Sequence, residues 1–212
     1  MMSYVAERHI LLIVVVIGLV VSGISPKDHV TWLLEALPVL IGIPILIYTR
    51  ARISLTPLVY RLLAGHAIIL MIGAHYTYAE VPLGRWIQDT FGFARNHYDR
   101  LGHLAQGFVP AMVIRDLLLR IWPLPSSYWL FLLVCAVCLA FSALYELFEW
   151  CTALMLGQSA TAFLATQGDE WDTQWDMFMA LVGSIVAQLS LSKIQYRQFM
   201  SLPLRPPQGD PS

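Results

Sequence analysis

Acidic and imidazole side chains recur at helical spacing in three separate stretches of this sequence. Side chains three or four residues apart share one face of an α-helix. The residues are, in chain order, Asp99, His103, Glu146, Glu149, Asp172 and Asp176. Carboxylate oxygens suit Mg²⁺ or Mn²⁺, and an added imidazole allows Zn²⁺. All six are therefore candidate metal ligands and candidate catalytic residues.

Three kinds of role fit such a set. A bound divalent cation could polarise a phosphoryl or carbonyl group or activate water, with Arg100 positioning an anionic group. Closely spaced carboxylates could instead share protons and couple transport to a proton gradient. They could also pair with Arg95 or Arg100 and only hold helix ends together.

Long apolar runs must carry these residues. The chain has 212 residues, of which 58% are hydrophobic and 13% charged, against about 25% charged in ordinary soluble domains. Since about 20 apolar residues cross a bilayer, the sequence predicts an all-α, polytopic bundle of about six transmembrane helices. The runs are Ile10–Ser25, Trp32–Tyr48, Leu58–Tyr78, Leu101–Leu119, Tyr128–Met155 and Trp175–Leu191. Residues 1–202 form one membrane domain, and 203–212 are predicted to be a disordered cytoplasmic tail.

The first run raises the question of a signal peptide. It follows Arg8, and Val21-Ser22-Gly23 could pass as a cleavage site. Glu7 beside Arg8 weakens the charged region that such a signal needs, so an uncleaved first span is predicted. Cys135 and Cys138 lie inside an apolar run and are predicted to pack there as small side chains. A net charge of −1 without a basic patch argues against a nucleic-acid partner.

The distribution of basic residues predicts the orientation. If the six runs alternate in direction, nine of the 13 basic residues fall on one side and four on the other. The nine are Arg8, Arg50, Arg52, Arg61, Arg115, Arg120, Lys193, Arg197 and Arg205; the four are Lys27, Arg85, Arg95 and Arg100. The positive-inside rule places the first side, and with it both termini, in the cytoplasm.

In this orientation the acidic blocks lie at one depth. Glu146 is 18 residues beyond Tyr128, roughly 27 Å along a helix, which is near the outer edge of a core about 30 Å thick. His103 lies at the outer start of the fourth run, and Asp176 at the outer start of the sixth. The three blocks are therefore predicted to meet in one cavity near the outer surface.

Three longer blocks carry a resemblance to a known family. They are Asn96–His103 with Gln106, Gly107 and Arg115; Tyr145-Glu146-x-x-Glu149-Trp150; and Gln167–Met177. Over most of the chain, from about the second run to the sixth, the sequence resembles the YjdF family of bacterial inner-membrane proteins. The resemblance implies a multi-pass protein of the cell inner membrane and supplies no reaction. A weaker likeness is to VanZ-like membrane proteins: Asp176 and Gly183 fit their last helix, but Ala180 replaces an Asn.

The predicted function is a periplasm-facing, metal-assisted enzyme that acts on a lipid-linked or other envelope substrate. The alternatives are a small proton- or ion-coupled transporter and a non-catalytic membrane scaffold. A transporter needs polar groups that continue across the membrane, whereas Tyr128–Phe141 and Met177–Ala187 are almost wholly apolar. A scaffold does not need so many carboxylates at one depth. The sequence leaves the substrate, the metal and the oligomeric state open.

Overall fold

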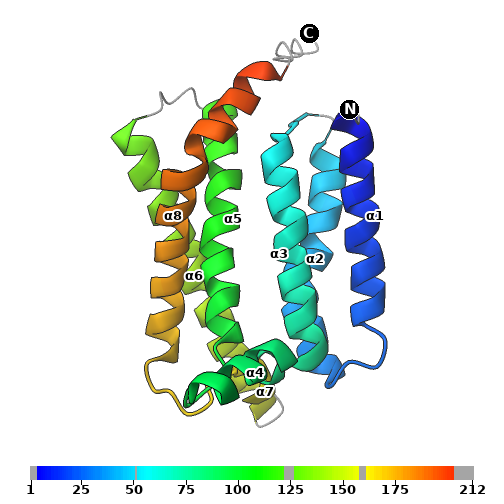
Figure 1. Cartoon of the computed structure of the whole chain (residues 1–212), viewed down its shortest axis with the longest axis vertical. Coiled ribbons are helices and arrows are strands. Elements are labelled where there is room, and N and C mark those ends of the chain that lie inside the picture. The colour runs from blue at the N-terminus through cyan, green and yellow to red at the C-terminus, as the bar shows by residue number, and fades with distance from the viewer. Residues whose placement is uncertain (1–3, 51, 122–126, 158–160, 203–212) are drawn as a thin grey trace.

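Six long helices run side by side along the molecule (Figure 1). The computed structural model describes residues 4–50, 52–121, 127–157 and 161–202, and within these ranges all regular structure is helical. The long helices are α1 (Tyr4–Ser22), α2 (His29–Thr49), α3 (Pro57–Tyr76), α5 (Tyr98–Ile121), α6 (Tyr128–Leu156) and α8 (Asp172–Ser201). The predicted all-α polytopic bundle is confirmed as the fold class. The predicted disordered tail lies outside the described residues.

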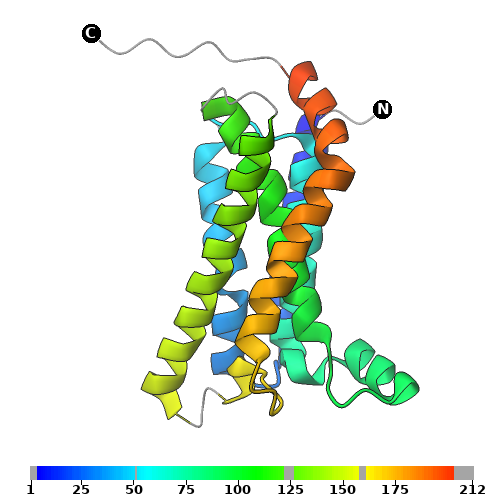
Figure 2. The same cartoon turned by 90° about the vertical axis from the view of Figure 1, so that its left-hand side faces the viewer.

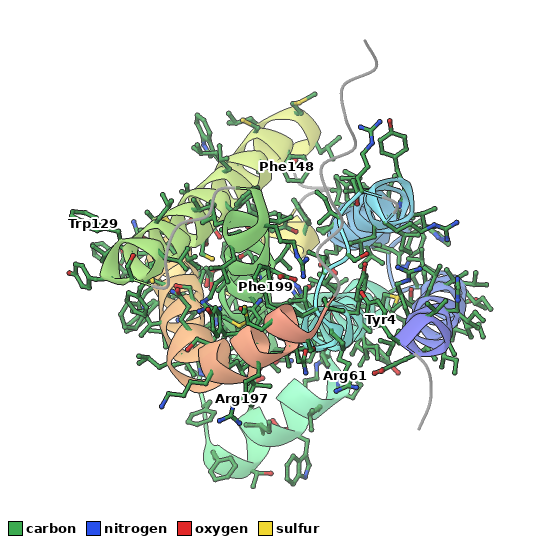
Figure 3. The ribbon with its side chains drawn as sticks, turned by 90° about the horizontal axis from the view of Figure 1, so that it is seen from above. Tyr4, Arg61, Trp129, Phe148, Arg197 and Phe199 are labelled. Atoms are coloured by element: carbon green, nitrogen blue, oxygen red, sulfur yellow. The ribbon has the colours of Figure 1, made fainter. Side chains whose placement is uncertain are left out.

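Five of these helices, α1, α2, α3, α6 and α8, are long and apolar enough to span a membrane. The sixth, α5, has 24 residues, roughly 36 Å at 1.5 Å per residue, but charged residues near both its ends lower its hydropathy. Three of these, Asp99, Arg115 and Asp116, are buried. The helix packs against α3, α6 and α8 near the middle of the bundle (Figure 3). These three charged side chains therefore face protein and not lipid, as is usual in membrane proteins.

Short helices gather at one end of the bundle, called the α4 end below. They are the 3-10 helix η1 (Tyr78–Glu80), α4 (Pro82–Phe91) and α7 (Thr161–Leu164). No helix was predicted here from the apolar runs of the sequence. Figure 2 shows α4 projecting to one side, and its Leu83, Trp86 and Phe91 are exposed. An amphipathic helix with exposed aromatic side chains is typical of a membrane–water interface.

The opposite end, called the terminal end below, is where α1 begins and α8 ends (Figure 1). There Asp116 is fully buried and both of its oxygens have donors. Oδ2 accepts from the backbone N–H of Thr56 at 2.7 Å, and Oδ1 accepts from Arg120 Nε at 3.1 Å. Gln195 links α8 to α5 through Arg115 at 2.9 Å and the carbonyl of Met112 at 2.6 Å. These bonds fix α3, α5 and α8 together.

The orientation of the bundle in the membrane remains a prediction from the basic residues. A reporter fused after Arg205 is expected to behave as cytoplasmic, and one inserted near Gly168 as periplasmic, because the sequence assigns nine of the 13 basic residues to the side of the two termini. Paired alkaline phosphatase and fluorescent-protein fusions measure this. High phosphatase activity of the C-terminal fusion would reverse the orientation and move the acidic blocks to the cytoplasmic side.

Candidate functional site

Helices α5 and α8 touch backbone to backbone where they cross. A Cβ atom on Gly107 would overlap the carbonyl group of Ala180, and one on Gly183 would overlap the carbonyl oxygen of Leu104. Small residues allow such close approach between helices in membranes. Each helix continues from this crossing toward the α4 end, so its polar N-terminal turns lie beside those of the other helix.

The crossing brings together a compact group of ligand-type side chains. Asp99, His103 and Asp176 are buried, and each offers one ligand atom within 4.8 Å of the others. His103 Nε2 also lies 3.7 Å from Glu146 Oε1, which comes from α6, and 3.7 Å from Asp99 Oδ1. Four of the six candidate ligands, His103 and the carboxylates of Asp99, Glu146 and Asp176, thus lie close together.

The other nitrogen of His103 is held by Gln106, one turn further along α5. His103 Nδ1 lies 2.8 Å from Gln106 Oε1. With this amide oxygen as the acceptor, Nδ1 of the neutral ring carries the hydrogen and Nε2 keeps its lone pair. That lone pair faces the carboxylates of Asp99 and Glu146. A histidine that binds metal through one nitrogen usually donates from the other in this way.

Asp172, the fifth candidate, pairs with a buried arginine. Arg95 lies in the segment before α5 and is 6% exposed. Its Nη1 forms an ion pair with Asp172 and lies 3.3 Å from Asp169, while its Nη2 lies 3.7 Å from Asp99. Nη2 also donates to the carbonyl of Ala165 at 3.2 Å. Arg95 therefore neutralises part of the acidic group and ties three segments together.

Arg100, the predicted anion-positioning residue, already has a carboxylate partner. Its Nη2 lies 2.5 Å from Asp169 Oδ2, and its guanidinium lies 5.2 Å from the centre of the Trp175 ring. The backbone N–H of Trp171, followed by the charges of Arg100 and Arg95, lowers the pKa of Asp169. Asp169 is thus held ionised in the loop before α8, next to both arginines.

Asn96 joins three segments of the chain by hydrogen bonds at the α4 end, next to this group. Its backbone N–H donates to Gln167 Oε1 and its carbonyl accepts from Gln167 Nε2, both at 2.9 Å. Its side-chain oxygen accepts from the N–H of Tyr98 at 3.0 Å, which caps α5. Its side-chain nitrogen donates to the carbonyls of Ala79 and Val81. The first and third blocks of the sequence are therefore locked to each other.

The remaining candidates lie further out, and one buried acid was missed. Glu149 is half-buried and is not part of the compact group. His75, in the last turn of α3, is also outside this group and places Nδ1 3.0 Å from the carbonyl oxygen of Ser22. Glu35 of α2 is 2% exposed, approaches the backbone N–H of Tyr78 and interacts electrostatically with Asp99. Glu35 is the one charged residue in the run Trp32–Tyr48. An ionisable residue within a transmembrane run is by default a candidate functional residue, so the sequence could have indicated it.

A family model described as predicted membrane protein (DUF2238) matches residues 7–197, which include every residue of the site. The chain belongs to this family. The inner membrane protein YjdF of Escherichia coli (strain K12) is 50% identical to this chain over 180 residues, which cover 85% of this chain and 86% of that protein. The resemblance to the YjdF family is confirmed, and with the five apolar helices it identifies a multi-pass inner-membrane protein. No solved structure matches the chain.

Proposed function

We propose that the protein binds a divalent cation between α5, α6 and α8 and uses it in a metal-assisted reaction on a lipid-linked or other envelope substrate. The observation that carries this proposal is the convergence of Asp99, His103 and Asp176, whose ligand atoms lie within 4.8 Å of one another. Ligands on opposite sides of one ion are separated by twice the metal–ligand distance, about 4 to 5 Å. Small side-chain rotations would therefore let all three reach one ion.

The balance of buried charge supports a cation here. Five carboxylates of the α4 half are buried: Glu35, Asp99, Glu146, Asp172 and Asp176. Arg95 is the buried guanidinium beside them, so four negative charges are left over when all five are ionised and His103 is neutral. Burying a carboxylate without a partner costs several kcal/mol. A divalent cation would offset much of that excess.

Unpartnered oxygens point to the same place. Glu146 Oε1 and Asp176 Oδ1 are buried and have no hydrogen-bond partner among the described residues. Asp116 at the terminal end is equally buried, but both of its oxygens accept hydrogen bonds. The comparison supports a ligand role for the first two side chains and a structural role for Asp116. An ion held by them would act as a Lewis acid or activate water.

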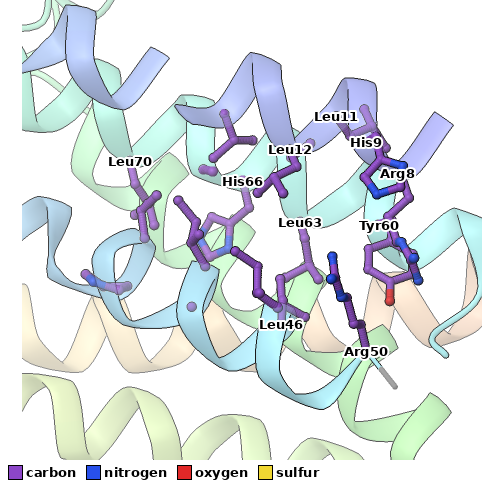
Figure 4. A pocket seen from close by; sticks show the side chains of 18 of the residues that line it. Arg8, His9, Leu11, Leu12, Leu46, Arg50, Tyr60, Leu63, His66 and Leu70 are labelled. Carbon is purple, nitrogen blue, oxygen red and sulfur yellow. The ribbon is translucent and has the colours of Figure 1, made fainter. Parts of the chain in front are cut away.

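A proton- or ion-coupled carrier is the second candidate, and His66 of α3 favours it. His66 interacts electrostatically with His103, and its Nε2 is buried without a hydrogen-bond partner in the described ranges. His66 therefore adds one more polar side chain to the cluster around His103, on the side toward the terminal end. Beyond it, however, Leu12, Leu46 and Leu63 separate His66 from the polar side chains at the far end of the same cavity (Figure 4), and leucines offer no relay for protons or ions.

Metal binding is expected to stabilise the folded protein. Adding Mg²⁺, Mn²⁺ or Zn²⁺ to chelator-treated protein in detergent should raise its thermal midpoint, with a stabilisation of about 2.7 kcal/mol at a hundredfold excess over the dissociation constant. Asp176→Asn and His103→Gln should each abolish the rise, because each removes a ligand from the compact group. The midpoint is measured by scanning fluorimetry at several metal concentrations.

The matched control is Glu170→Gln, which removes an exposed carboxylate from the loop just before α8 and should keep the full response. Asp116→Asn is unsuitable, because it would disturb the buried contacts of Asp116 with Thr56 and Arg120. An equal response in all variants would indicate nonspecific binding to acidic loops. No response of the wild-type protein to any of the three metals would favour proton sharing or a scaffold.

A further inference from the structure

A cavity of about 290 Å³ lies among α1, α2 and α3, away from the acidic group. The turn that joins α1 to α2 holds these helices together near the α4 end, where Trp32 Nε1 donates to Ser22 Oγ at 3.2 Å. The cavity occupies the other half of the three-helix unit, toward the terminal end, and Pro110 of α5 contributes to its wall. Figure 4 shows the side chains that line it.

The lining changes in character along the cavity. Arg8, His9, Arg50 and Tyr60 gather at one end, and the other labelled side chains, apart from His66, are leucines (Figure 4). The guanidinium of Arg8 lies 5.9 Å from the centres of the Tyr4 and Tyr60 rings. Neither Arg8 nor Arg50 forms an ion pair within the described part of the chain; the nearby Glu7 pairs with Arg61. Two guanidinium groups without a carboxylate partner thus lie at one end of this largely apolar cavity, which is called the groove below.

We propose that this groove binds one anionic phospholipid, with an acyl chain along the leucines and the phosphate at Arg8 and Arg50. The length fits: Tyr60 and Leu70 are ten residues apart on α3, roughly 15 Å, which is half of the about 30 Å hydrocarbon core. The groove therefore follows one leaflet. Guanidinium groups bind phosphate with charge-assisted hydrogen bonds, and basic pockets between transmembrane helices recognise anionic headgroups.

Gly42 allows a direct test of the groove. It lines the cavity, and a Cβ atom added to it meets no atom within 4 Å. A leucine there is therefore expected to occupy the space proposed for the acyl chain. Gly65 of α3 is a matched control, because it also has open space around an added Cβ and does not line the cavity.

Lipid binding is measured by native mass spectrometry of delipidated protein titrated with phosphatidylglycerol or with phosphatidylcholine of the same acyl chains. The wild-type protein is expected to bind one phosphatidylglycerol about tenfold more tightly than phosphatidylcholine. Both lipids offer a phosphate to the two arginines, but the choline cation of phosphatidylcholine is repelled by them. Gly42→Leu should weaken binding of both lipids about tenfold or more. Arg8→Gln combined with Arg50→Gln should weaken binding of phosphatidylglycerol more than binding of phosphatidylcholine, and should thereby remove the preference.

Gly65→Leu, and Arg197→Gln in the exposed last turns of α8, should match the wild-type protein in both titrations. The thermal midpoint without lipid checks that each variant is folded; if Gly42→Leu does not fold, the double arginine variant decides the test. Equal affinity for the two lipids in the wild-type protein overturns the proposal. So does unchanged lipid affinity in a folded Gly42→Leu protein. The test does not depend on the cation site.

Discussion

Replacing Arg95 with glutamine is expected to destabilise the folded protein by about 3 to 5 kcal/mol, the cost of breaking a buried ion pair by removing one partner. The Arg95 and Asp172 side chains are each only 7% exposed, so water cannot replace the lost partner. Arg95 also lies within 4 Å of Asp99 and Asp169, and its loss leaves the acidic group without its buried guanidinium. Unfolding in detergent by heat or denaturant measures the change.

Two variants separate this cause from a general sensitivity of the region. Arg95→Gln combined with Asp172→Asn removes both charges and is expected to recover a large part of the stability. Arg100→Gln breaks a pair whose side chains are 19% and 22% exposed, and should cost about 1 kcal/mol or less. If Arg95→Gln and Arg100→Gln destabilise the protein equally, or if the double variant is no better than Arg95→Gln, the buried pair is not the cause.

The bundle could be predicted because long apolar runs determine membrane helices almost directly. The ends of the helices were less predictable. The sixth run was predicted to end at Leu191, but α8 continues to Ser201. Its last turns carry Lys193, Gln195 and Arg197, which end the apolar signal. Gln195 is nevertheless buried and bonded to Arg115 and Met112 of α5, a contact that the apolar pattern of α8 alone does not contain.

The parts of the candidate site that depend on the spacing of residues along one helix could be predicted. The contacts between side chains from different segments could not. Spacing placed Asp99 with His103 and Asp172 with Asp176, because these pairs lie on single helices. The selection of Arg95 as the buried partner of Asp172 depends on the path of the chain before α5, which the sequence does not reveal. Glu35 was missed because no second ionisable residue lies three or four positions from it in the sequence.

Substitution of leucine for Gly107 or Gly183 is expected to destabilise the bundle by about 3 kcal/mol each, the upper end of the usual cost of overpacking. In both cases the obstructing atoms belong to the backbone of the facing helix. A flexible side chain could turn aside, but the backbone of α5 or α8 can yield only if the two helices separate. The same unfolding measurement in detergent tests both variants.

Gly65→Leu is the matched control, since it places the same side chain on a helix with open space around it, and it should change stability little. Because His103 lies one turn from Gly107, and Asp176 two turns from Gly183, a separation of α5 from α8 also spreads the proposed ligands. Any Gly107→Leu or Gly183→Leu protein that still folds should therefore lose its thermal response to added metal, while Gly65→Leu keeps it. Wild-type stability in both crossing variants would show that α5 and α8 do not meet backbone to backbone at these glycines.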